Sequence, residues 1–313
     1  MYDKSEILLG IKNPYLLARE VNRSVHKKIK KPLIQSNCVD ILNEDWDNLL
    51  ILDACRYDYF KQESELPGTL DHRLSQGSST TEFLIENFQN EKLHDTVYIT
   101  ANPMIYKKTN QINAEFYDIC HVWNKEWDND LYTVPPEAMT EYIEKYSKKH
   151  PNKKLLIHYN QPHHPFIGPT AEKNLDFSDY AEPVSNESRM NFWLKVSTGN
   201  VDISTHSLRQ AYVETLRYTL PHIKDAIKLL NGKTVVSADH GEMLGERMSP
   251  LPIKGFGHPN GLYPNTLLKV PWLEHTRGER RKIIAEDPVS TVAEDDLEHQ
   301  ARERLGHLGY LVE

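Results

Sequence analysis

The sequence is poor in cysteine and carries no excess of basic charge. Only three of its 313 residues are cysteines, Cys38, Cys55 and Cys120. So sparse and odd a set does not form the disulfide framework of a secreted domain, and it favours a reducing, cytoplasmic location. Acidic residues outnumber basic ones by 45 to 37, which gives a formal net charge of −8. This balance argues against a nucleic-acid partner, since proteins that bind nucleic acids need a basic face to displace counterions from the phosphates.

Long apolar runs are also missing. The most apolar stretches are 48–52, 154–157 and 270–273. All of them fall far below the roughly 18 apolar residues that a membrane-spanning helix needs. We therefore expect no transmembrane segment, and the first 20 residues lack the pattern of an export signal. Residues 23–31 are basic. They form either a solvated helix face or linker, or a contact with an anionic membrane surface, which would take more than one such signal.

The remaining composition is that of an ordinary soluble protein. Hydrophobic residues make up 39% of the chain and charged residues 26%. Such a balance argues against wholesale disorder, and the length is ample for a sizeable core. We expect one catalytic domain over residues 45–313, with residues 1–44 as an N-terminal extension that packs on it. The oligomeric state is left open by the sequence.

Short apolar runs alternate with helical patterns along the chain. The runs that predict buried strands are 49–52, 96–100, 155–158 and 234–238. The helical patterns cover 81–88, 137–148, 207–230 with a kink at Pro221, and a tail over 293–312 that ends at Gly309. This alternation predicts an α/β fold, a three-layer sandwich with a mostly parallel sheet between helices. The stretches 165–205 and 245–266 are predicted to be functional rims or disordered loops.

Carboxylates and imidazoles follow three of the predicted strands. Asp53 follows the first strand, His163 the third, and Asp239 and His240 the fourth, while His258 comes later in a Gly-His-Pro sequence. Because ligands of such sheets bind beyond the carboxyl ends of the strands, these side chains should gather at one edge. Carboxylate oxygens and neutral imidazole nitrogens suit zinc, manganese or a similar divalent ion. A buried cluster of this kind would be costly without a cation.

Two hydroxyl side chains begin the helix that follows the first strand. Ser79 and Glu82 match a capping box, in which the serine accepts a hydrogen bond from a helix N–H group. A hydroxyl group there also lies in the positive field of a helix N-terminus, where anions bind. Coordination to a metal would lower its pKa and make it a nucleophile. Ser79 alone is explained by capping, but Asp53 and the Asp239–His240 pair favour a catalytic hydroxyl.

Five sequence segments together resemble the alkaline phosphatase superfamily, on its sulfatase-like side. They are, in order, LILDACRYDYF, GSSTTEF, IHYNQPHHPFIGP, VVSADHGEMLGE and GHP. The fourth is the most specific, since it is similar to the segment that supplies two metal ligands in sulfatases and in lipid-headgroup phosphotransferases. The resemblance spans about residues 45–275, and the ending LGHLGYLVE also resembles sulfatase-like C-termini. It implies an alkaline phosphatase-like fold and a metal-dependent hydrolase or transferase of phosphate or sulfate esters.

The resemblance also implies roles for individual residues. Asp53, Asp239 and His240 would hold a divalent ion, which could be zinc, manganese or calcium. Thr80 or Ser79 would complete its ligands and attack the substrate, and we favour Thr80 because Ser79 then remains free to shape the turn. His163 matches the family histidine that contacts the substrate anion or a second metal. His258 matches the histidine after the Asp-His-Gly-Glu loop and is predicted as a catalytic residue and a metal ligand. One metal site is predicted firmly, and a second remains open.

One departure from the family bears on the chemistry. Sulfatases carry Cys/Ser-x-Pro-x-Arg, whose first residue is oxidised to formylglycine, and this pattern is absent here. Cys55 lacks that motif and is interpreted as a buried small residue. An unmodified Thr or Ser nucleophile indicates phosphoryl rather than sulfuryl chemistry, through a covalent intermediate. Glycan-linked and lipid-linked esters are both open as substrates. The alternative is a catalytically silent relative that serves as a binding or assembly module.

The other polar residues near these motifs are expected to support the site and not to carry out the chemistry. Arg56 is either a cationic contact for the substrate or a structural ion-pair partner. His164 is expected to be a surface neighbour of His163. Glu242 and Glu246 are either metal ligands or, as we favour, residues that support the ligands and order the loop after the last predicted strand.

Overall fold

The centre of the molecule is a seven-stranded sheet with the strand order β2-β9-β6-β1-β5-β3-β4. This computed structural model describes residues 13–175, 192–289 and 297–310. The strands are β1 (Asn48–Leu52), β2 (Thr69–Leu74), β3 (Lys92–Thr100), β4 (Glu115–His121), β5 (Lys154–Tyr159), β6 (Gly232–Ala238) and β9 (Lys269–Arg277). The run β6-β1-β5-β3-β4 is parallel, whereas β9 pairs antiparallel with both β6 and β2.

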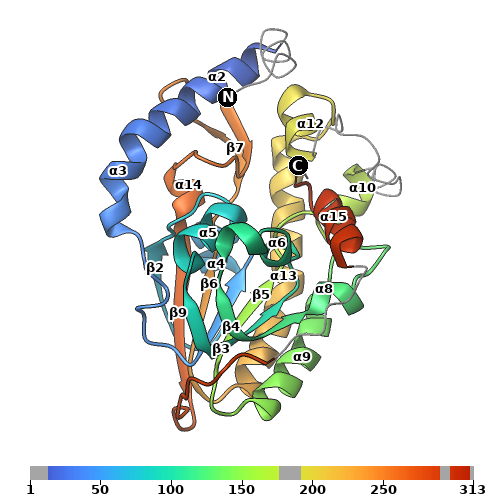
Figure 1. Ribbon diagram of the computed structural model, residues 1–313. Coiled ribbons are helices and arrows are strands. Elements are labelled where there is room, and N and C mark those ends of the chain that lie inside the picture. The colour runs from blue at the N-terminus through green and yellow to red at the C-terminus, as the bar shows by residue number, and fades with distance from the viewer. Residues whose placement is uncertain (1–12, 176–191, 290–296, 311–313) are drawn as a thin grey trace.

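Helices cover both faces of this sheet (Figure 1). They are α4 (Tyr57–Glu63), α5 (Thr80–Phe88), α6 (Met104–Lys107), α7 (Thr109–Ile112), α8 (Val122–Lys125), α9 (Pro136–Lys149), α10 (Pro169–Asn174), α12 (Phe192–Thr198), α13 (Thr205–Leu229), α14 (Asn265–Leu268) and α15 (Leu297–His307). A separate hairpin pairs β7 (Met243–Arg247) with β8 (Lys254–Gly257).

Strand β1 shows how the sequence builds the layers. Its side chains alternate between the two faces, as in any strand. Leu50 and Leu52 pack in the cluster that includes α9 and α13, whereas Leu49 and Ile51 pack in the cluster that includes α5. All five residues of β1 are buried, as expected of a central parallel strand. The predicted three-layer α/β sandwich is therefore confirmed.

The sequence also led to wrong expectations. It missed β2, β4, β9 and the β7–β8 hairpin. Of the two stretches expected to be rims or loops, 165–205 contains α10 and α12, and 245–266 contains β8 and parts of β7 and α14. Residues 176–191 of that stretch lie outside the described residues, as do 293–296 and 311–312 of the predicted tail helix. α13 continues through Pro221, and a left-handed Gly309, with φ 79°, follows α15. No helix in the described part of the chain is long and apolar enough to cross a membrane.

The N-terminal residues form a rod on the outside of the molecule (Figure 1). It consists of α2 (Pro14–Val25), a π-helical turn η1 (His26–Lys30), α3 (Lys31–Ile34) and a 3₁₀ turn η2 (Gln35–Asn37). Its inner face packs on the segment 249–263. Asn22 exchanges two hydrogen bonds with the backbone of Leu251, and His26 bonds the Ser249 carbonyl at 2.8 Å. The boundary at residue 44 stays a prediction.

Candidate active site

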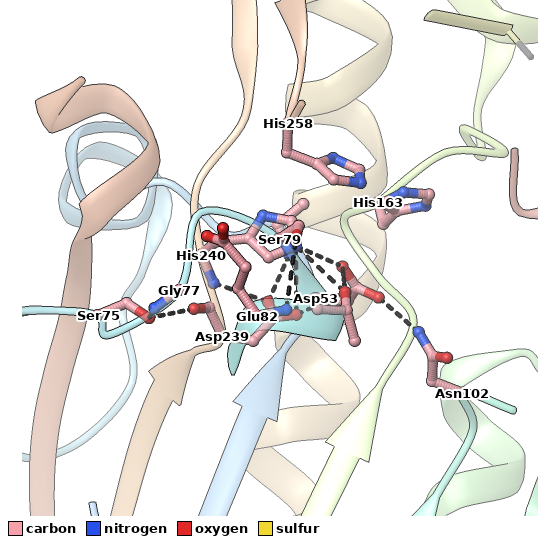
Figure 2. Close-up of polar contacts among 12 residues, drawn as sticks. Asp53, Ser75, Gly77, Ser79, Glu82, Asn102, His163, Asp239, His240 and His258 are labelled. Carbon is pink, nitrogen blue, oxygen red and sulfur yellow. Dashed lines mark hydrogen bonds and ion pairs between the residues drawn. The ribbon is translucent and has the colours of Figure 1, made fainter. Parts of the chain in front are cut away.

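The predicted strand-end residues meet above the carboxyl ends of β1 and β6. These strands are neighbours, with Leu52 opposite Ala238, so the next residues, Asp53 and Asp239, lie side by side. Thr80 reaches the same place as the first residue of α5. Figure 2 shows His240 beside the two carboxylates and His163 and His258 above them. The sheet edge therefore brings together the side chains that the sequence singled out.

Four atoms form a compact set suited to a metal ion. Thr80 Oγ1 lies 2.8 Å from Asp239 Oδ2, 3.2 Å from His240 Nε2 and 3.5 Å from Asp53 Oδ1. His240 Nε2 lies 3.3 Å from Asp239 Oδ2 and 3.6 Å from Asp53 Oδ1. A tetrahedral ion with ligands at roughly 2.0–2.1 Å requires separations of about 3.3–3.4 Å between them. Four of these five separations, from 3.2 to 3.6 Å, lie close to that value, and the fifth, at 2.8 Å, is a hydrogen bond from Thr80 to Asp239, so the residues fit a divalent ion.

Backbone groups orient Asp239 toward this set. Its Oδ1 accepts hydrogen bonds from the backbone N–H groups of Ala54 at 3.0 Å and of His240 at 2.8 Å. Ala54 has a φ of 60°, a left-handed conformation that costs energy in a residue with a Cβ. Tyr212 donates to the Ala54 carbonyl at 2.8 Å and holds this turn in place. With Oδ1 occupied, Oδ2 of Asp239 faces Thr80 and His240.

Side chains orient Asp53, and a backbone carbonyl orients His240. Asp53 Oδ2 accepts from Asn102 Nδ2 at 2.8 Å and from Tyr310 at 3.3 Å, which leaves Oδ1 for the four-atom set. His240 Nδ1 lies 2.8 Å from the Gly241 carbonyl. Because a carbonyl oxygen only accepts, Nδ1 carries the proton and the lone pair of Nε2 points at the set. Such outer contacts fix the orientation of metal ligands in known sites.

Burial makes the site electrostatically costly without a cation. Asp53, Asp239 and His240 are almost completely buried. Burial, reinforced by the Asp239 charge, raises the pKa of Asp53 well above its usual value. Burial also lowers the pKa of His240 and keeps its imidazole neutral. Two adjacent carboxylates in a desolvated pocket repel each other, and a divalent cation would offset that repulsion.

The two hydroxyl candidates have different surroundings. Ser79 is the N-cap of α5, and its Oγ accepts from the Glu82 N–H group at 3.4 Å. Thr80 Oγ1 instead touches all three predicted metal ligands. The expected capping box is only half formed, because the Glu82 carboxylate bonds the N–H group and the hydroxyl of Ser78 and accepts from Tyr263. The geometry therefore favours Thr80 over Ser79 as the hydroxyl at the site.

A second cluster of possible ligands lies beside the first. It contains His163, Glu242 and His258, whose ligand atoms lie within 4.8 Å of one another. His258 Nδ1 is 3.0 Å from Glu242 Oε1, and its ring lies 4.4 Å from that of His240. The β7–β8 hairpin builds this contact, because Met243 pairs with Gly257 and so brings Glu242 and His258 together.

His258 thus belongs to this second cluster, outside the four-atom set. The predicted metal-ligand role of His258 and the catalytic role of His163 stay predictions. Glu242, for which a supporting role was favoured over a ligand role, is a buried partner of His258, and burial raises its pKa well above the usual value. Burial lowers the pKa of His258 to about 4. His163 Nε2 is buried and has no hydrogen-bond partner within the described structure.

Two residues at the site were not identified from the sequence. Tyr310 places its hydroxyl 2.8 Å from Thr80 Oγ1, and its ring stacks on His163 with centroids 5.6 Å apart. It arrives there because Leu305 of α15 is anchored in the core and Gly309 turns the chain. Asn102 follows β3 and reaches Asp53. The only sequence signal for Tyr310 was its place in the family-like ending, and a lone asparagine after a strand gave none.

The neighbouring residues have mainly structural roles. Arg56 pairs with Asp58 and Glu246, each at 2.6 Å, so it acts as a structural ion-pair partner. Cys55 is buried in the core as interpreted, and burial raises its pKa well above the usual value. The expectation that His164 lies at the surface is wrong. It is 1% exposed and packs against the rings of Phe192 and Trp193.

Comparisons with known proteins give one family match. The model of the Sulfatase family matches residues 58–299. No curated protein sequence matches the chain significantly.

Several solved structures are similar. The C-terminal periplasmic domain of phosphoethanolamine transferase EptC from Campylobacter jejuni has 15% identity and a TM-score of 0.45, over 73% of this chain and 78% of that one. Lipoteichoic acid synthase LtaP from Listeria monocytogenes has 11% identity and a TM-score of 0.42, over 81% and 72%. Phosphonate monoester hydrolase SpPMH from Silicibacter pomeroyi has 14% identity and a TM-score of 0.39, over 83% and 72%.

Proposed function

Because this chain belongs to the sulfatase family, we propose that it is a metal-dependent enzyme that transfers or hydrolyses phosphate esters through a covalent intermediate on Thr80. The family match confirms the resemblance to the sulfatase-like side of the alkaline phosphatase superfamily. The observation that carries the proposal is the environment of Thr80 Oγ1, which lies within 3.5 Å of ligand atoms from Asp53, Asp239 and His240.

The residues that would hold the metal are Asp53, Thr80, Asp239 and His240. The bound ion would lower the pKa of the Thr80 hydroxyl and offset charge on the transferring group. A nitrogen ligand and a compact set of four atoms favour zinc or manganese over calcium, which prefers six to eight oxygen ligands. The cluster of His163, Glu242 and His258 is a candidate second site.

Four side chains of the protein take part in the proposed reaction. Thr80 Oγ1 attacks phosphorus, so a P–O bond to threonine forms while the bond to the leaving alcohol breaks. Burial raises the pKa of Tyr310, so its hydroxyl keeps its proton and, 2.8 Å away, would donate it in a hydrogen bond to Thr80 Oγ1 once that oxygen develops negative charge. Burial lowers the pKa values of His163 and His258, so both rings are neutral, and they would either complete the second metal site or accept the Thr80 proton and pass it to the leaving alcohol. Water or an acceptor alcohol then attacks phosphorus from the vacated side and releases Thr80.

Phosphate is the favoured substrate class over sulfate. Sulfuryl transfer in this family uses the oxidised residue of a Cys/Ser-x-Pro-x-Arg motif, which the sequence lacks. Cys55 is no substitute, because it is buried and its raised pKa keeps it a thiol. A threonine hydroxyl activated by a metal is instead suited to attack the phosphorus atom of a phosphate ester. The ester is either glycan-linked or lipid-linked, and both hydrolysis and transfer follow from the same covalent intermediate.

The test compares two adjacent hydroxyl variants. Thr80→Ala should abolish turnover of an aryl phosphate diester and monoester, by at least about a thousandfold, because the nucleophile is gone. Ser79→Ala is the matched control: it removes a helix cap worth about 1 kcal/mol and should leave most activity. Metal content, measured by mass spectrometry, should be retained in the control. An active Thr80→Ala with an inactive Ser79→Ala would move the nucleophile by one residue.

The same experiment separates an enzyme from a silent binding module. Wild-type protein with bound metal and turnover of the aryl phosphate, but not of the aryl sulfate, supports the proposal. Protein without metal and without turnover of any ester would favour the silent alternative.

A further inference from the structure

The N-terminal rod exposes an unusual set of apolar side chains. Among the described residues, the four most exposed large hydrophobic side chains all lie on it. They are Leu17 (50%), Val21 (48%), Ile29 (58%) and Leu33 (71%). All four fall within one stretch from α2 to α3, whereas exposed hydrophobic residues elsewhere are scattered singly. Scattered apolar residues are normal on a surface, but a concentration on one element marks an interaction site.

The opposite face of the rod explains why these residues stay exposed. Leu16, Asn22 and His26 are buried, and the last two bond the backbone of residues 249–251. Tyr263 N–H donates to His26 Nδ1 at 2.7 Å and completes the attachment. The rod is therefore held firmly by one face, and the face with the apolar residues is turned outward. A helix that needed these leucines for the core would present them inward.

The charge of the rod is opposite to that of the rest of the protein. Residues 14–37 contain six cationic side chains and one anionic, a net charge of +5, whereas the rest of the chain carries −13. Lys27 and Lys28 are exposed between Val21 and Ile29. The acidic remainder of a second copy would also complement this charge, so dimerisation is one of the outcomes tested below. Apolar side chains interspersed with lysines instead match a surface of anionic lipid headgroups above acyl chains.

We propose that the outer face of the α2–α3 rod docks on an anionic lipid surface. Leu17, Val21, Ile29 and Leu33 would enter the boundary between headgroups and acyl chains, and the exposed Lys28 would pair with lipid phosphates. In this arrangement the rod lies parallel to the membrane surface. Binding of this kind buries only one face of a helix and does not require a helix that crosses the membrane. The basic charge of residues 23–31 is one signal for such a contact, and the exposed apolar stripe supplies the second.

Docking would also hold the active site close to the lipid. The rod packs on the segment 249–263, which carries His258. Gly261 N–H of that segment donates to Ser78 Oγ at 3.1 Å, and Tyr263 donates to Glu82 at 2.9 Å. Two residues after Ser78 comes Thr80. This part of the inference rests on the proposed function: the docked enzyme would act on a phosphate ester carried by a lipid.

The experiment measures binding of the full chain to lipid vesicles by flotation. Vesicles of phosphatidylglycerol and phosphatidylcholine in equal parts should bind the protein, and vesicles of phosphatidylcholine alone should bind it at least about tenfold more weakly. Raising the salt concentration should weaken binding to the anionic vesicles.

Matched variants separate the rod from general effects of surface charge. Lys28→Glu combined with Leu33→Ser should lower vesicle binding at least about tenfold, since each cation near an anionic surface strengthens binding about fivefold. Lys224→Glu combined with Leu229→Ser makes the same changes at exposed positions on α13 and should bind as the wild type does. Both variants should turn over a soluble aryl phosphate normally.

Three results would overturn the docking proposal. The first is equal binding to neutral and anionic vesicles, and the second is unchanged binding of the rod variant. The third is a concentration-dependent dimer, seen by ultracentrifugation, that the rod variant loses while vesicles bind neither protein. A wild-type protein that binds anionic vesicles but turns over no ester would refute the proposed function and leave the docking surface intact.

Discussion

Replacing Tyr310 with phenylalanine removes one hydroxyl group from the centre of the site and leaves the ring in place. That hydroxyl lies 2.8 Å from Thr80 Oγ1 and 3.3 Å from Asp53 Oδ2. Its ring stacks on His163 through carbon atoms that phenylalanine retains. The change therefore tests one donor while the packing of the tail is preserved.

The size of the effect follows from the charge that the hydroxyl faces. As Thr80 attacks, its oxygen carries developing negative charge, and Tyr310 is a proton donor directed at that oxygen. The other neighbours, Asp53, Asp239 and the bare Nε2 of His240, are acceptors. A hydrogen bond to a charged group contributes about 1.5–3 kcal/mol. At about 1.4 kcal/mol for each factor of ten in rate, Tyr310→Phe should lower kcat roughly ten- to hundredfold.

Steady-state kinetics with an aryl phosphate at saturating metal would measure this loss. The fall should appear in kcat with little change in KM, because the bond strengthens in the transition state. Tyr142→Phe is the matched control, since that hydroxyl bonds Glu126 on the surface and should not affect turnover. A Tyr310→Phe enzyme as fast as the wild type would refute the donor role. A faster enzyme would refute it as well and would identify the tyrosine hydroxyl as an obstruction in the site.

Two further predictions concern stability. Asp53→Asn should raise the stability of the metal-free protein, because it removes one of two repelling buried carboxylates. Asp53→Asn should also abolish the increase in melting temperature that zinc or manganese causes. In the wild type this increase corresponds to about 2.7 kcal/mol of stabilisation at a metal concentration a hundredfold above Kd. A variant whose melting temperature still rises with metal would contradict the assigned ligand set. Burial lowers the pKa of His26, so the folded protein favours its neutral form. The contribution of neutral His26 to stability is therefore present above the unfolded pKa of about 6.5 and is lost as the pH falls below it. Urea unfolding at about pH 5 and about pH 7.5 should show this difference in the wild type, and His26→Gln should reduce it.

The fold was predictable where burial dictates residue type. The strands β1, β3, β5 and β6 lie inside the sheet and are covered on both faces, so their sequences read as apolar runs. β2 lies at an edge, and none of the six residues of its sequence TLDHRL is buried. β9 contains Pro271 and charged residues, which argue against a strand when the sequence is considered alone. Only pairing with β6 and β2, which is a tertiary property, makes β9 a strand.

The site was predictable where the topology of the sheet fixes position. Parallel strands end at a common edge, so Asp53 and the Asp239–His240 pair could be placed together without coordinates. Thr80 followed from the helix start predicted between the first two strands, although α4 and β2, which the sequence missed, separate that helix from β1. Glu242 reached His258 through a hairpin in a stretch that the sequence indicated to be a loop. Tyr310 came from an element far along the chain, and no local pattern specifies such a contact.

The two carboxylates at the site differ in how they are held, and this difference bears on the chemistry. Asp239 is fixed by two backbone N–H groups, which no side-chain substitution removes and which the strained turn at Ala54 holds in place. Asp53 is fixed by the side chains of Asn102 and Tyr310. Asp239 is thus the rigid reference for the site, while the orientation of Asp53 depends on the same tyrosine whose hydroxyl contacts Thr80. The position of the tail is thereby coupled both to a predicted metal ligand and to the nucleophile.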